Sequence, residues 1–484
     1  MRSDLSSTEA SASPLLRRGD TLELVTEKVA DRGKCIAYHN DRVIFVPQTL
    51  AREQVRVKIR KRRKKFAEAQ LLDVLTPSPN RVKPQCQYFG SCGGCSLQHV
   101  DYRQQLEDKH QLIRETMERQ AGFPGLEIRT PIKADATYAY RNKMEFSFSS
   151  HRWLSWEEIA SNQTFDTSFA LGLHPPNLFA KILDIHQCHL QGDRSNAVVN
   201  GIRDLAINLN WPPWNWRNKE GFLRHLVIRQ SAYMPDFMVN LVTSEYDAKR
   251  MLRLAMYLKI SHPHVTTLIN TINSTPAQTA FGEQAETIYG PGILKDRIGE
   301  ITFEIAPGAF FQTNTLQAEK LVQVVQDLAK VSTKDHVYDL YCGTGTMALS
   351  LAKGAKHVTG IELIKDAIVN AKNNASLNGI NNCSFISGDM LKLLKPDFIL
   401  KHGSPDIIIL DPPRAGMHPK VATQISELNV RKIVYVSCNV QSQARDLSIL
   451  SKSYKAVVAQ PVDLFPHTHH IENVVLLEKR NGNG

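Results

Sequence analysis

Strands and helices alternate along the C-terminal part of the chain, from about residue 301 onward. Short apolar runs at 407–410 and 433–436 are rich in β-branched residues and stop abruptly at polar residues, which is typical of buried parallel strands. A stretch such as 364–378 between runs of this kind has a helical pattern. The alternation predicts an α/β fold with a doubly wound sheet, because parallel neighbours need crossover helices.

Two of these strands end at side chains that could take part in a reaction. Asp411 and two prolines follow the strand at 407–410, and Cys438 follows the strand at 433–436. Open α/β sheets bind ligands at the carboxyl ends of their strands. A thiol beside a carboxylate there suggests covalent catalysis. The alternative is that Cys438 is a small core residue, since free cysteine is commonly buried.

A glycine-containing loop, Asp-Leu-Tyr-Cys-Gly-Thr-Gly-Thr at 339–346, joins the strand at 337–340 to its helix. The glycines let the backbone turn tightly and approach a ligand closely. Carboxylates end the next two strands, where a ribose diol and an adenine edge could meet them. This arrangement resembles the S-adenosylmethionine site of class I methyltransferases, with a phosphate-binding or structural turn as the alternative. The candidate cofactor-binding residues here are Tyr341, Gly343, Gly345, Thr346, Glu362 and Asp389.

The front of the chain is strongly basic. Short strands and turns between residues 17 and 76, with turns at 31–33 and 40–41, predict a small barrel of the OB type. From Arg56 to Lys65, eight of ten residues are Lys or Arg, and the whole chain has a net charge of +11. This favours contact with the phosphates of a polyanionic partner, with a solvated hairpin tip as the alternative.

Four of the eight cysteines have a metal-like distribution. Cys86, Cys92 and Cys95 lie within ten residues of one another, and Cys188 is the natural fourth ligand. Three thiolates so close together indicate a metal ion or an iron–sulfur cluster in a cytosolic protein. Zinc accepts the same four ligands and stays an alternative. The spacing does not match that of radical S-adenosylmethionine enzymes.

Other segments carry weaker signals. A helix is expected from about 97 to 120, with Tyr102, Leu106, Ile113 and Met117 on one face. The tryptophan-rich segment at 211–216 is expected to be a packed surface loop rather than a platform for a base. Pro466-His-Thr-His-His brings three imidazoles together, and two would share a face in a strand, but no further ligand for a metal is apparent.

The motifs together resemble the RNA uracil-5-methyltransferase family. Asp-Pro-Pro-Arg-Ala-Gly at 411–416, Ser-Cys-Asn at 437–439 and His-Ile-Glu-Asn at 470–473 occur in that family's order. Ala-Phe-Phe-Gln-Thr-Asn at 309–314 is similar to its phenylalanine-glutamine motif, and the barrel resembles a TRAM domain. Val440 departs from the pattern, because the family usually has proline at that position.

The resemblance implies methyl transfer from S-adenosylmethionine to C5 of a uridine in RNA. Cys438 would add to C6 as a thiolate, which needs a lowered pKa, and Glu472 would remove the C5 proton. A turn-capping carboxylate is the alternative for Glu472. Asp411 and Gln312 would contact the base or the cofactor. The four cysteines would hold a [4Fe-4S] cluster, and the target would be 23S ribosomal RNA, with transfer RNA as the alternative.

Two other functions compete with this one. Methylation of an exocyclic amine is disfavoured, because Arg414 stands where such sites place an aromatic residue. A non-catalytic iron–sulfur RNA-binding protein would leave Cys438 and Glu472 without a role. No apolar run approaches ~18 residues, and the first residues lack the apolar core of a signal peptide. We therefore expect a cytoplasmic monomer without a membrane partner.

These observations predict five segments along the chain. They are a disordered tail (1–16), a TRAM-like barrel (17–76), a cluster segment with a helix (77–125), a central α/β RNA-binding domain that contributes Cys188 (126–300), and a methyltransferase domain (301–484). The architecture of the central domain does not follow from its pattern.

Overall fold

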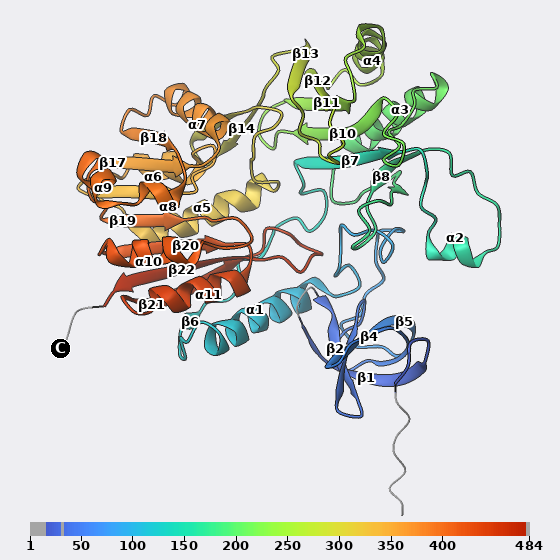
Figure 1. The fold of residues 1–484 in the computed structure, drawn as a ribbon, viewed down its shortest axis with the longest axis horizontal. Coiled ribbons are helices and arrows are strands. Elements are labelled where there is room, and N and C mark those ends of the chain that lie inside the picture. The colour runs from blue at the N-terminus through green and yellow to red at the C-terminus, as the bar shows by residue number, and fades with distance from the viewer. Residues whose placement is uncertain (1–15, 31–32, 481–484) are drawn as a thin grey trace, which may run out of the picture.

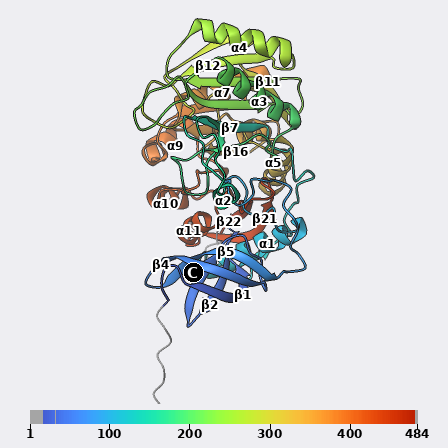
Figure 2. The ribbon, with the colours of Figure 1, turned by 90° about the vertical axis from the view of Figure 1, so that its right-hand side faces the viewer.

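The structure, a computed structural model, describes residues 16–30 and 33–480. The tail predicted at the N-terminus, apart from its last residue, and two of the three residues of the turn at 31–33 lie outside this part. Figure 1 shows the C-terminal sheet on the left, the barrel at the lower right and a second sheet at the upper right. In Figure 2 the barrel lies at the bottom and the second sheet at the top. Within the described residues, no helix combines the length and apolarity needed to cross a membrane.

The N-terminal barrel is closed by five strands in the order β1-β2-β3-β5-β4. Val55, Val57 and Ile59 alternate with basic residues along β4 and are fully buried, so one face of the strand fills the barrel. Asn40 and Asp41 have φ values of 48° and 59°, which confirms the predicted turn. The strands are β1 (Thr21–Val29), β2 (Cys35–His39), β3 (Arg42–Val46), β4 (Gln54–Arg62) and β5 (Phe66–Thr76).

The central region forms a seven-stranded sheet in the order β13-β12-β11-β10-β7-β8-β9. Helices α3 (Asp193–Asn208) and α4 (Ala248–Ser261) pack against it through apolar faces in one core. The short helix α2 (Trp156–Ala160) lies between β7 and β8. The strands are β7 (Lys143–Ser149), β8 (Ala170–Leu173), β9 (Leu183–Asp184), β10 (Leu223–Gln230), β11 (Phe237–Thr243), β12 (Thr267–Ile272) and β13 (Gln284–Tyr289).

The C-terminal region confirms the predicted doubly wound sheet. Its eight strands have the order β18-β17-β16-β19-β20-β22-β21-β6, and only β22 runs antiparallel to its neighbours. A hairpin of β14 (Leu294–Ile298) and β15 (Ile301–Ile305) precedes it. The sheet strands are β6 (Glu127–Ile128), β16 (His336–Leu340), β17 (His357–Glu362), β18 (Cys383–Ser387), β19 (Ile407–Leu410), β20 (Lys432–Ser437), β21 (Tyr454–Val462) and β22 (Glu472–Lys479).

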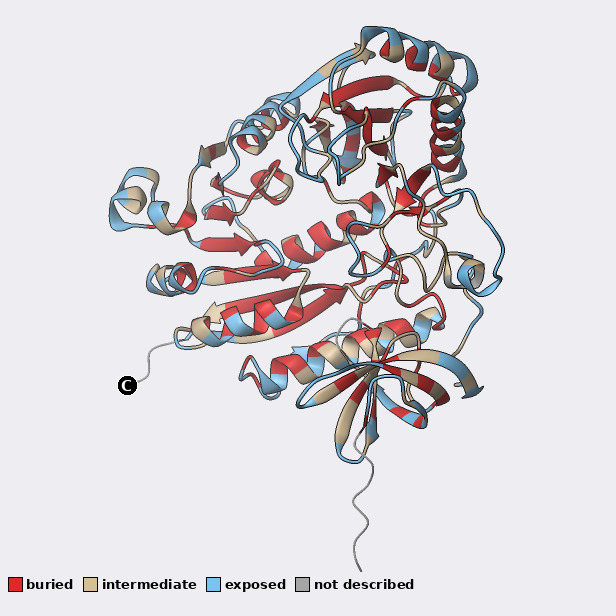
Figure 3. Cartoon of the chain, turned by 45° about the vertical axis from the view of Figure 1, so that its right-hand side comes forward, coloured by how far each residue is buried: buried red, intermediate tan, exposed pale blue. Residues whose placement is uncertain are grey.

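Helices cover both faces of this sheet, and the strands between them are buried (Figure 3). One core contains residues of α5, α6 and α7, and the other contains residues of α1, α8, α10 and α11. The helices are α1 (Tyr102–Arg119), α5 (Thr315–Ala329), α6 (Thr346–Ala352), α7 (Lys365–Leu377), α8 (Met390–Leu393), α9 (Pro396–His402), α10 (Pro419–Glu427) and α11 (Val440–Leu450).

Helix α1 joins the front of the chain to the C-terminal sheet. Ile113 and Met117 are fully buried, and Tyr102 and Leu106, on the same predicted face, are half-buried. Lys109 is buried as well, because its Nζ lies 2.8 Å from Oδ1 of Asp463. An apolar periodicity does not reveal a buried face that an ion pair helps to form.

Candidate active site

Cys438 and Glu472 are neighbours at the carboxyl end of β20. Strand β22 pairs with β20 in antiparallel register, and the last pair is Ser437 with Asn473. Cys438 is the first residue after β20, and Glu472 is the residue before Asn473. The charge of Glu472 raises the pKa of the Cys438 thiol, so the two groups lie near each other. The thiol and the carboxyl group therefore share one site although 34 positions separate them in the sequence.

Burial and charge set the acidity of the thiol. The pKa of Cys438 is raised to about 11, first by burial and then by the negative charges of Glu472 and Asp411, while Arg414 opposes the shift. The lowered pKa that we expected for Cys438 is therefore wrong for this structure. Two carboxyl groups at the same strand ends outweigh one guanidinium.

The carboxyl group of Glu472 is buried, with 5% of the residue exposed. Burial raises its pKa to about 8, and Asp411 adds to the shift while Arg414 opposes it. Burial also raises the pKa of Asp411 to about 7. Carboxyl groups with raised pKa values in a common site are suited to accept and donate protons near neutral pH.

The turn after β19 is fastened to the turn after β20. The backbone oxygen of Arg414 accepts hydrogen bonds from Nδ2 of Asn439 (3.0 Å) and Oγ of Ser442 (3.1 Å). The Arg414 side chain reaches His470, with Nη2 2.6 Å from Nδ1 of that ring. These bonds hold the elements that carry Asp411, Cys438 and Glu472 in fixed positions.

Val440, which replaces the proline usual in the family, is the first residue of α11 and is 6% exposed. Proline is favoured at the first residue of a helix because its fixed φ is already helical. Asn439 caps the helix, and its side chain accepts a hydrogen bond from the backbone N–H of Gln441 at 3.1 Å. This cap helps to fix the turn that carries Cys438, although residue 440 has no proline ring.

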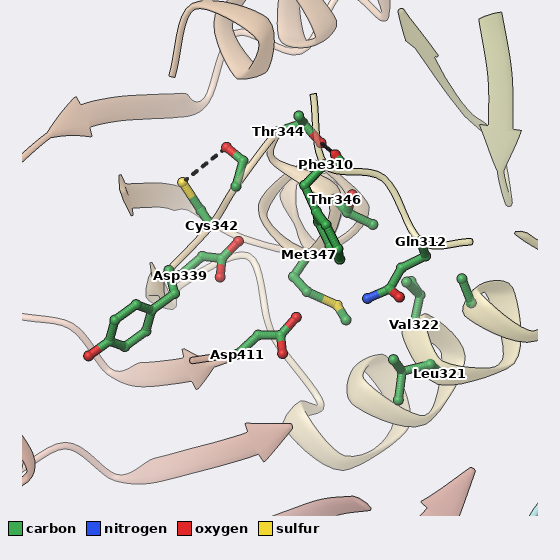
Figure 4. Close-up of a pocket in the computed structure, with 13 residues that line it drawn as sticks. Phe310, Gln312, Leu321, Val322, Asp339, Cys342, Thr344, Thr346, Met347 and Asp411 are labelled. Atoms are coloured by element: carbon green, nitrogen blue, oxygen red, sulfur yellow. Dashed lines mark hydrogen bonds between the residues drawn. The ribbon is translucent and has the colours of Figure 1, made fainter. Parts of the chain in front are cut away.

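A cavity of about 50 Å³ lies beside these strand ends (Figure 4). The loop after β16, the segment at 310–312 and the end of β19 line it. The amide of Gln312 and the carboxyl group of Asp411 reach toward the cavity from different sides (Figure 4). Five of the predicted cofactor-binding residues are in its lining: Gln312, Tyr341, Gly343, Thr346 and Asp411.

The two loop glycines have different surroundings. Gly343 lines the cavity and has a φ of 53°, and a Cβ atom there would meet nothing within 4 Å. Gly345 has a φ of 88° and is the N-cap of α6. A Cβ atom at Gly345 would lie 3.3 Å from Ala371 and Phe385. One glycine therefore leaves room for a ligand, and the other allows close packing.

The other two predicted cofactor residues lie next to this cavity rather than in its lining. Glu362 ends β17, and its Oε2 accepts a hydrogen bond from the backbone N–H of Gly343 at 3.3 Å. Asp389 is the N-cap of α8 and accepts a hydrogen bond from the backbone N–H of Leu391 at 3.0 Å. Both carboxylates thus have structural partners at the edge of the site.

Sequence reasoning missed two residues of the site. Asp339 is the last residue but one of β16, lines the cavity and is 1% exposed, and its Oδ1 has no hydrogen-bond partner among the described residues. Its position near the end of a strand was a usable signal. Asn142 comes from the central region and donates hydrogen bonds from Nδ2 to the backbone oxygen of Gln312 (2.8 Å) and to Oγ1 of Thr315 (2.7 Å). No local pattern indicates that contact.

The four predicted metal ligands line one cavity of about 350 Å³, together with residues of the central sheet. They are Cys86, Cys92, Cys95 and Cys188. Burial raises the pKa of Cys92 to about 12 and of Cys95 to about 11. In the part of the chain that the structure describes, no group of three or more His, Cys, Asp or Glu side chains could hold a metal ion. The thiols thus converge on one cavity without forming a single-ion site.

A turn connects the cysteine cavity to Glu472. The backbone oxygen of His467 accepts hydrogen bonds from the N–H groups of Ser96 and Leu97, both at 2.9 Å. His467 has a φ of 63° and lies in a turn, so the strand that would align it with His469 is not present there. The segment after Cys95 therefore supports the turn that leads into β22.

Comparison with known proteins identifies the family. Residues 293–480 match the model for tRNA (uracil-5-)-methyltransferases, and residues 16–72 match the TRAM domain. A protein of Bacteroides thetaiotaomicron, described as an uncharacterised RNA methyltransferase, is 39% identical over 93% of this chain and 100% of its own length. The chain belongs to the RNA uracil-5-methyltransferase family.

Further relatives agree with this assignment. A second uncharacterised RNA methyltransferase, from Chlorobaculum tepidum, is 40% identical over 96% of this chain and 97% of its own length. The crystal structure of Pyrococcus abyssi tRNA (uracil-54, C5)-methyltransferase with S-adenosyl-L-homocysteine superposes with a TM-score of 0.73. It is 27% identical and covers 94% of this chain and 99% of its own. The protein is an S-adenosylmethionine-dependent RNA uracil-5-methyltransferase with a class I fold and a TRAM domain.

Proposed function

We propose that this enzyme transfers the methyl group through a covalent adduct between Cys438 and the uracil ring. The sulfur of Cys438, having lost its proton to water, adds to C6 of the uracil. The electron pair displaced from the C5–C6 bond makes C5 nucleophilic, and C5 takes the methyl group from the sulfonium. Glu472 then removes the C5 proton, and the returning electron pair breaks the bond between sulfur and C6.

The observation that carries this proposal is the pairing of β20 with β22, which makes Cys438 and Glu472 neighbours. The mechanism needs a nucleophile and a base on one ring at adjacent carbon atoms, so the two side chains must be close together. Asp411 connects them to the cofactor cavity, because it lines that cavity and its charge acts on both groups.

The thiol must become a thiolate before it can attack. Arg414 lowers the pKa of Cys438 against the effect of burial, and the positive sulfonium of a bound cofactor would act in the same direction. We therefore propose that cofactor binding activates Cys438. We also propose that Glu362 and Asp389 contact the ribose and adenine from the edge of the site, while Gln312 contacts the methionine part or the uracil.

The test of the adduct uses RNA that contains 5-fluorouridine. Fluorine cannot leave as a proton, so a covalent complex should accumulate when cofactor is present. Peptide mass spectrometry should place the RNA on Cys438, and Cys438→Ala should abolish the complex. Cys383→Ala, a change at a cysteine of β18, is the matched control and should leave it intact. An adduct that survives in Cys438→Ala contradicts the assignment.

We also propose that Cys86, Cys92, Cys95 and Cys188 hold a [4Fe-4S] cluster. The four thiols face one cavity, and a four-iron cluster is larger than one ion, so its ligand sulfur atoms stand farther apart. A bound cluster would fasten the segment around Cys92 to the central sheet, next to the turn that precedes Glu472. The role proposed for it is structural or RNA-orienting, with redox sensing as the lesser alternative.

Iron content tests the cluster. Anaerobically purified protein should be brown and contain about four iron atoms and four sulfides per chain, as one such cluster requires. Cys92→Ser should be colourless and less stable, whereas Cys383→Ser should keep its iron. Retained brown colour and unchanged iron in Cys92→Ser would overturn the assignment. One zinc ion per chain in place of iron would favour the zinc alternative.

For the substrate, we propose a uridine in 23S ribosomal RNA. The support is the resemblance to the cluster-bearing branch of the family, while the relative from Pyrococcus abyssi is by its title a transfer RNA enzyme. We also propose that the enzyme is a monomer that acts in the cytoplasm. Mapping 5-methyluridine in ribosomal and transfer RNA from cells with and without the gene decides between the targets.

A further inference from the structure

The central region has a second small cavity that the methyl-transfer site does not use. Trp214, Trp216, Arg224 and His225 line it, together with Ser147 and Phe179. It lies between β7, β10 and the tryptophan-rich loop. The residue types are those by which proteins bind unpaired nucleotides: aromatic rings, a guanidinium group and a few hydrogen-bonding groups.

Aromatic rings form an accessible wall of this cavity. Trp216 is 46% exposed and Phe179 is 77% exposed, although both are large apolar side chains. The guanidinium group of Arg224 lies 4.3 Å from the ring centre of Trp214. Trp211 is 4% exposed and belongs to the core. The expectation of a packed loop thus holds for the first tryptophan, whereas the last leaves its ring open to solvent.

A short chain of hydrogen bonds defines the polar side of the cavity. Nδ1 of His174 lies 3.1 Å from the backbone oxygen of Lys181, so it carries the proton, and Nε2 accepts from Oγ of Ser147 at 3.2 Å. Oγ of Ser147 then accepts from Nδ1 of His225 at 3.2 Å. This order leaves Nε2 of His225 as an acceptor. Burial lowers the pKa of His225 to about 4, so the ring is neutral at neutral pH.

Arg224 adds a donor with no partner. It is 2% exposed, and its Nη1 donates a hydrogen bond to the backbone oxygen of Asn273 at 2.6 Å. Its Nε is buried and has no hydrogen-bond partner among the described residues. A buried donor without a partner is costly. The cavity thus combines an acceptor and aromatic surface with the buried guanidinium group of Arg224 in its lining.

The cavity adjoins the cysteine cavity. His174 and Phe179 line both cavities. Arg141 also lines the cysteine cavity, and its guanidinium group lies 5.9 Å from the ring centre of Phe465. Phe465 belongs to the turn that leads to Glu472.

We propose that this cavity is a subsite for an unpaired base of the RNA substrate, which stacks on Trp216 and Phe179 and donates an N–H group to His225. Every base has an aromatic face and an N–H group on its pairing edge, so the subsite favours single strands without selecting one sequence. The proposal depends on RNA being the substrate and is independent of the roles given to Cys438 and Glu472.

The test compares RNA binding by variants of the full-length protein. Fluorescence anisotropy with an unstructured oligoribonucleotide of about ten nucleotides measures affinity without cofactor, so its outcome does not depend on catalysis. Trp216→Ala should raise the Kd roughly tenfold, and Trp216→Phe should restore much of the affinity. Ile260→Ala is the matched control, because Ile260 is 78% exposed on α4 of the same region and should not alter the Kd.

Ultraviolet cross-linking gives a second, independent result. With the wild-type protein, cross-linked nucleotides should map to the peptide that contains Trp214 and Trp216 or to the peptide that contains Phe179. A Kd for Trp216→Ala equal to that of Ile260→Ala, together with no cross-link on these peptides, would overturn the proposal. Normal thermal denaturation of Trp216→Ala would show that a weaker affinity is not caused by unfolding.

Discussion

Replacing Glu472 with glutamine should stabilise the protein at alkaline pH but not at acid pH. The structure raises the pKa of this carboxyl group from 4.5 to about 8. At 1.36 kcal/mol per pKa unit, the shift corresponds to roughly 5 kcal/mol. Because the folded-state pKa is above the unfolded-state pKa, stabilisation by the bound proton is complete below about 4.5 and is lost as the pH rises through about 8. Glutamine has no proton to lose, so the variant escapes this loss.

Urea denaturation at about pH 5, 7 and 9, followed by circular dichroism, measures the difference. The free energy of unfolding of Glu472→Gln minus that of the wild type should rise with pH by several kcal/mol. Glu478, which lies on the same strand with 38% of its side chain exposed, provides the control, and Glu478→Gln should follow the wild type at every pH. A difference for Glu472→Gln that does not change with pH would refute the claim that this carboxyl group is held uncharged by burial.

Three further predictions concern the ion pair beneath the site, the cofactor loop and the general base. Lys109→Ala leaves Asp463 buried without its ion-pair partner and should lower the free energy of unfolding by about 3–5 kcal/mol, measured by denaturant unfolding. An unchanged denaturation midpoint would contradict this prediction. Gly343→Ala should keep the fold at a cost of about 1–2 kcal/mol but weaken the binding of S-adenosylhomocysteine measured by calorimetry. Gly345→Ala should destabilise the fold more, because its Cβ atom would lie 3.3 Å from two side chains. Equal stabilities of the two variants would count against this account. The rate of single-turnover methyl transfer should rise by at least roughly tenfold per pH unit below about 8. Glu472 accepts the proton only when it is ionised, and Cys438 attacks only as the thiolate. A flat profile would exclude Glu472 as the base.

The C-terminal sheet shows which strands an apolar sequence pattern can predict and which it cannot. Apolar runs that end at polar residues located β16, β17, β19 and β20 from the sequence, because a buried parallel strand needs a continuous apolar segment. Strand β21 was missed, since charged Lys455 interrupts its first half and only its last five residues are all buried. The two-residue strand β6 exists only because it pairs with β21, and no local signal can indicate such a contact.

The same division holds for the site. Cys438, Asp411 and Gly343 were found because strand ends and glycine turns carry local chemical signals. The pKa of Cys438 could not be predicted from the sequence, because it depends on how deeply the strand end is buried and on charges from other segments. Asn142 was missed for a related reason, because its contact with the Gln312 segment joins residues 170 positions apart. Local sequence gives the groups, and tertiary packing gives their environment.

The most direct test of the mechanism is the rate of methyl transfer by Cys438→Ala. Under single-turnover conditions with saturating cofactor, this variant should show no transfer above background, while its affinity for S-adenosylhomocysteine stays near that of the wild type. Cys383→Ala should react at the wild-type rate. Formation of 5-methyluridine by Cys438→Ala at the wild-type rate would contradict the covalent mechanism.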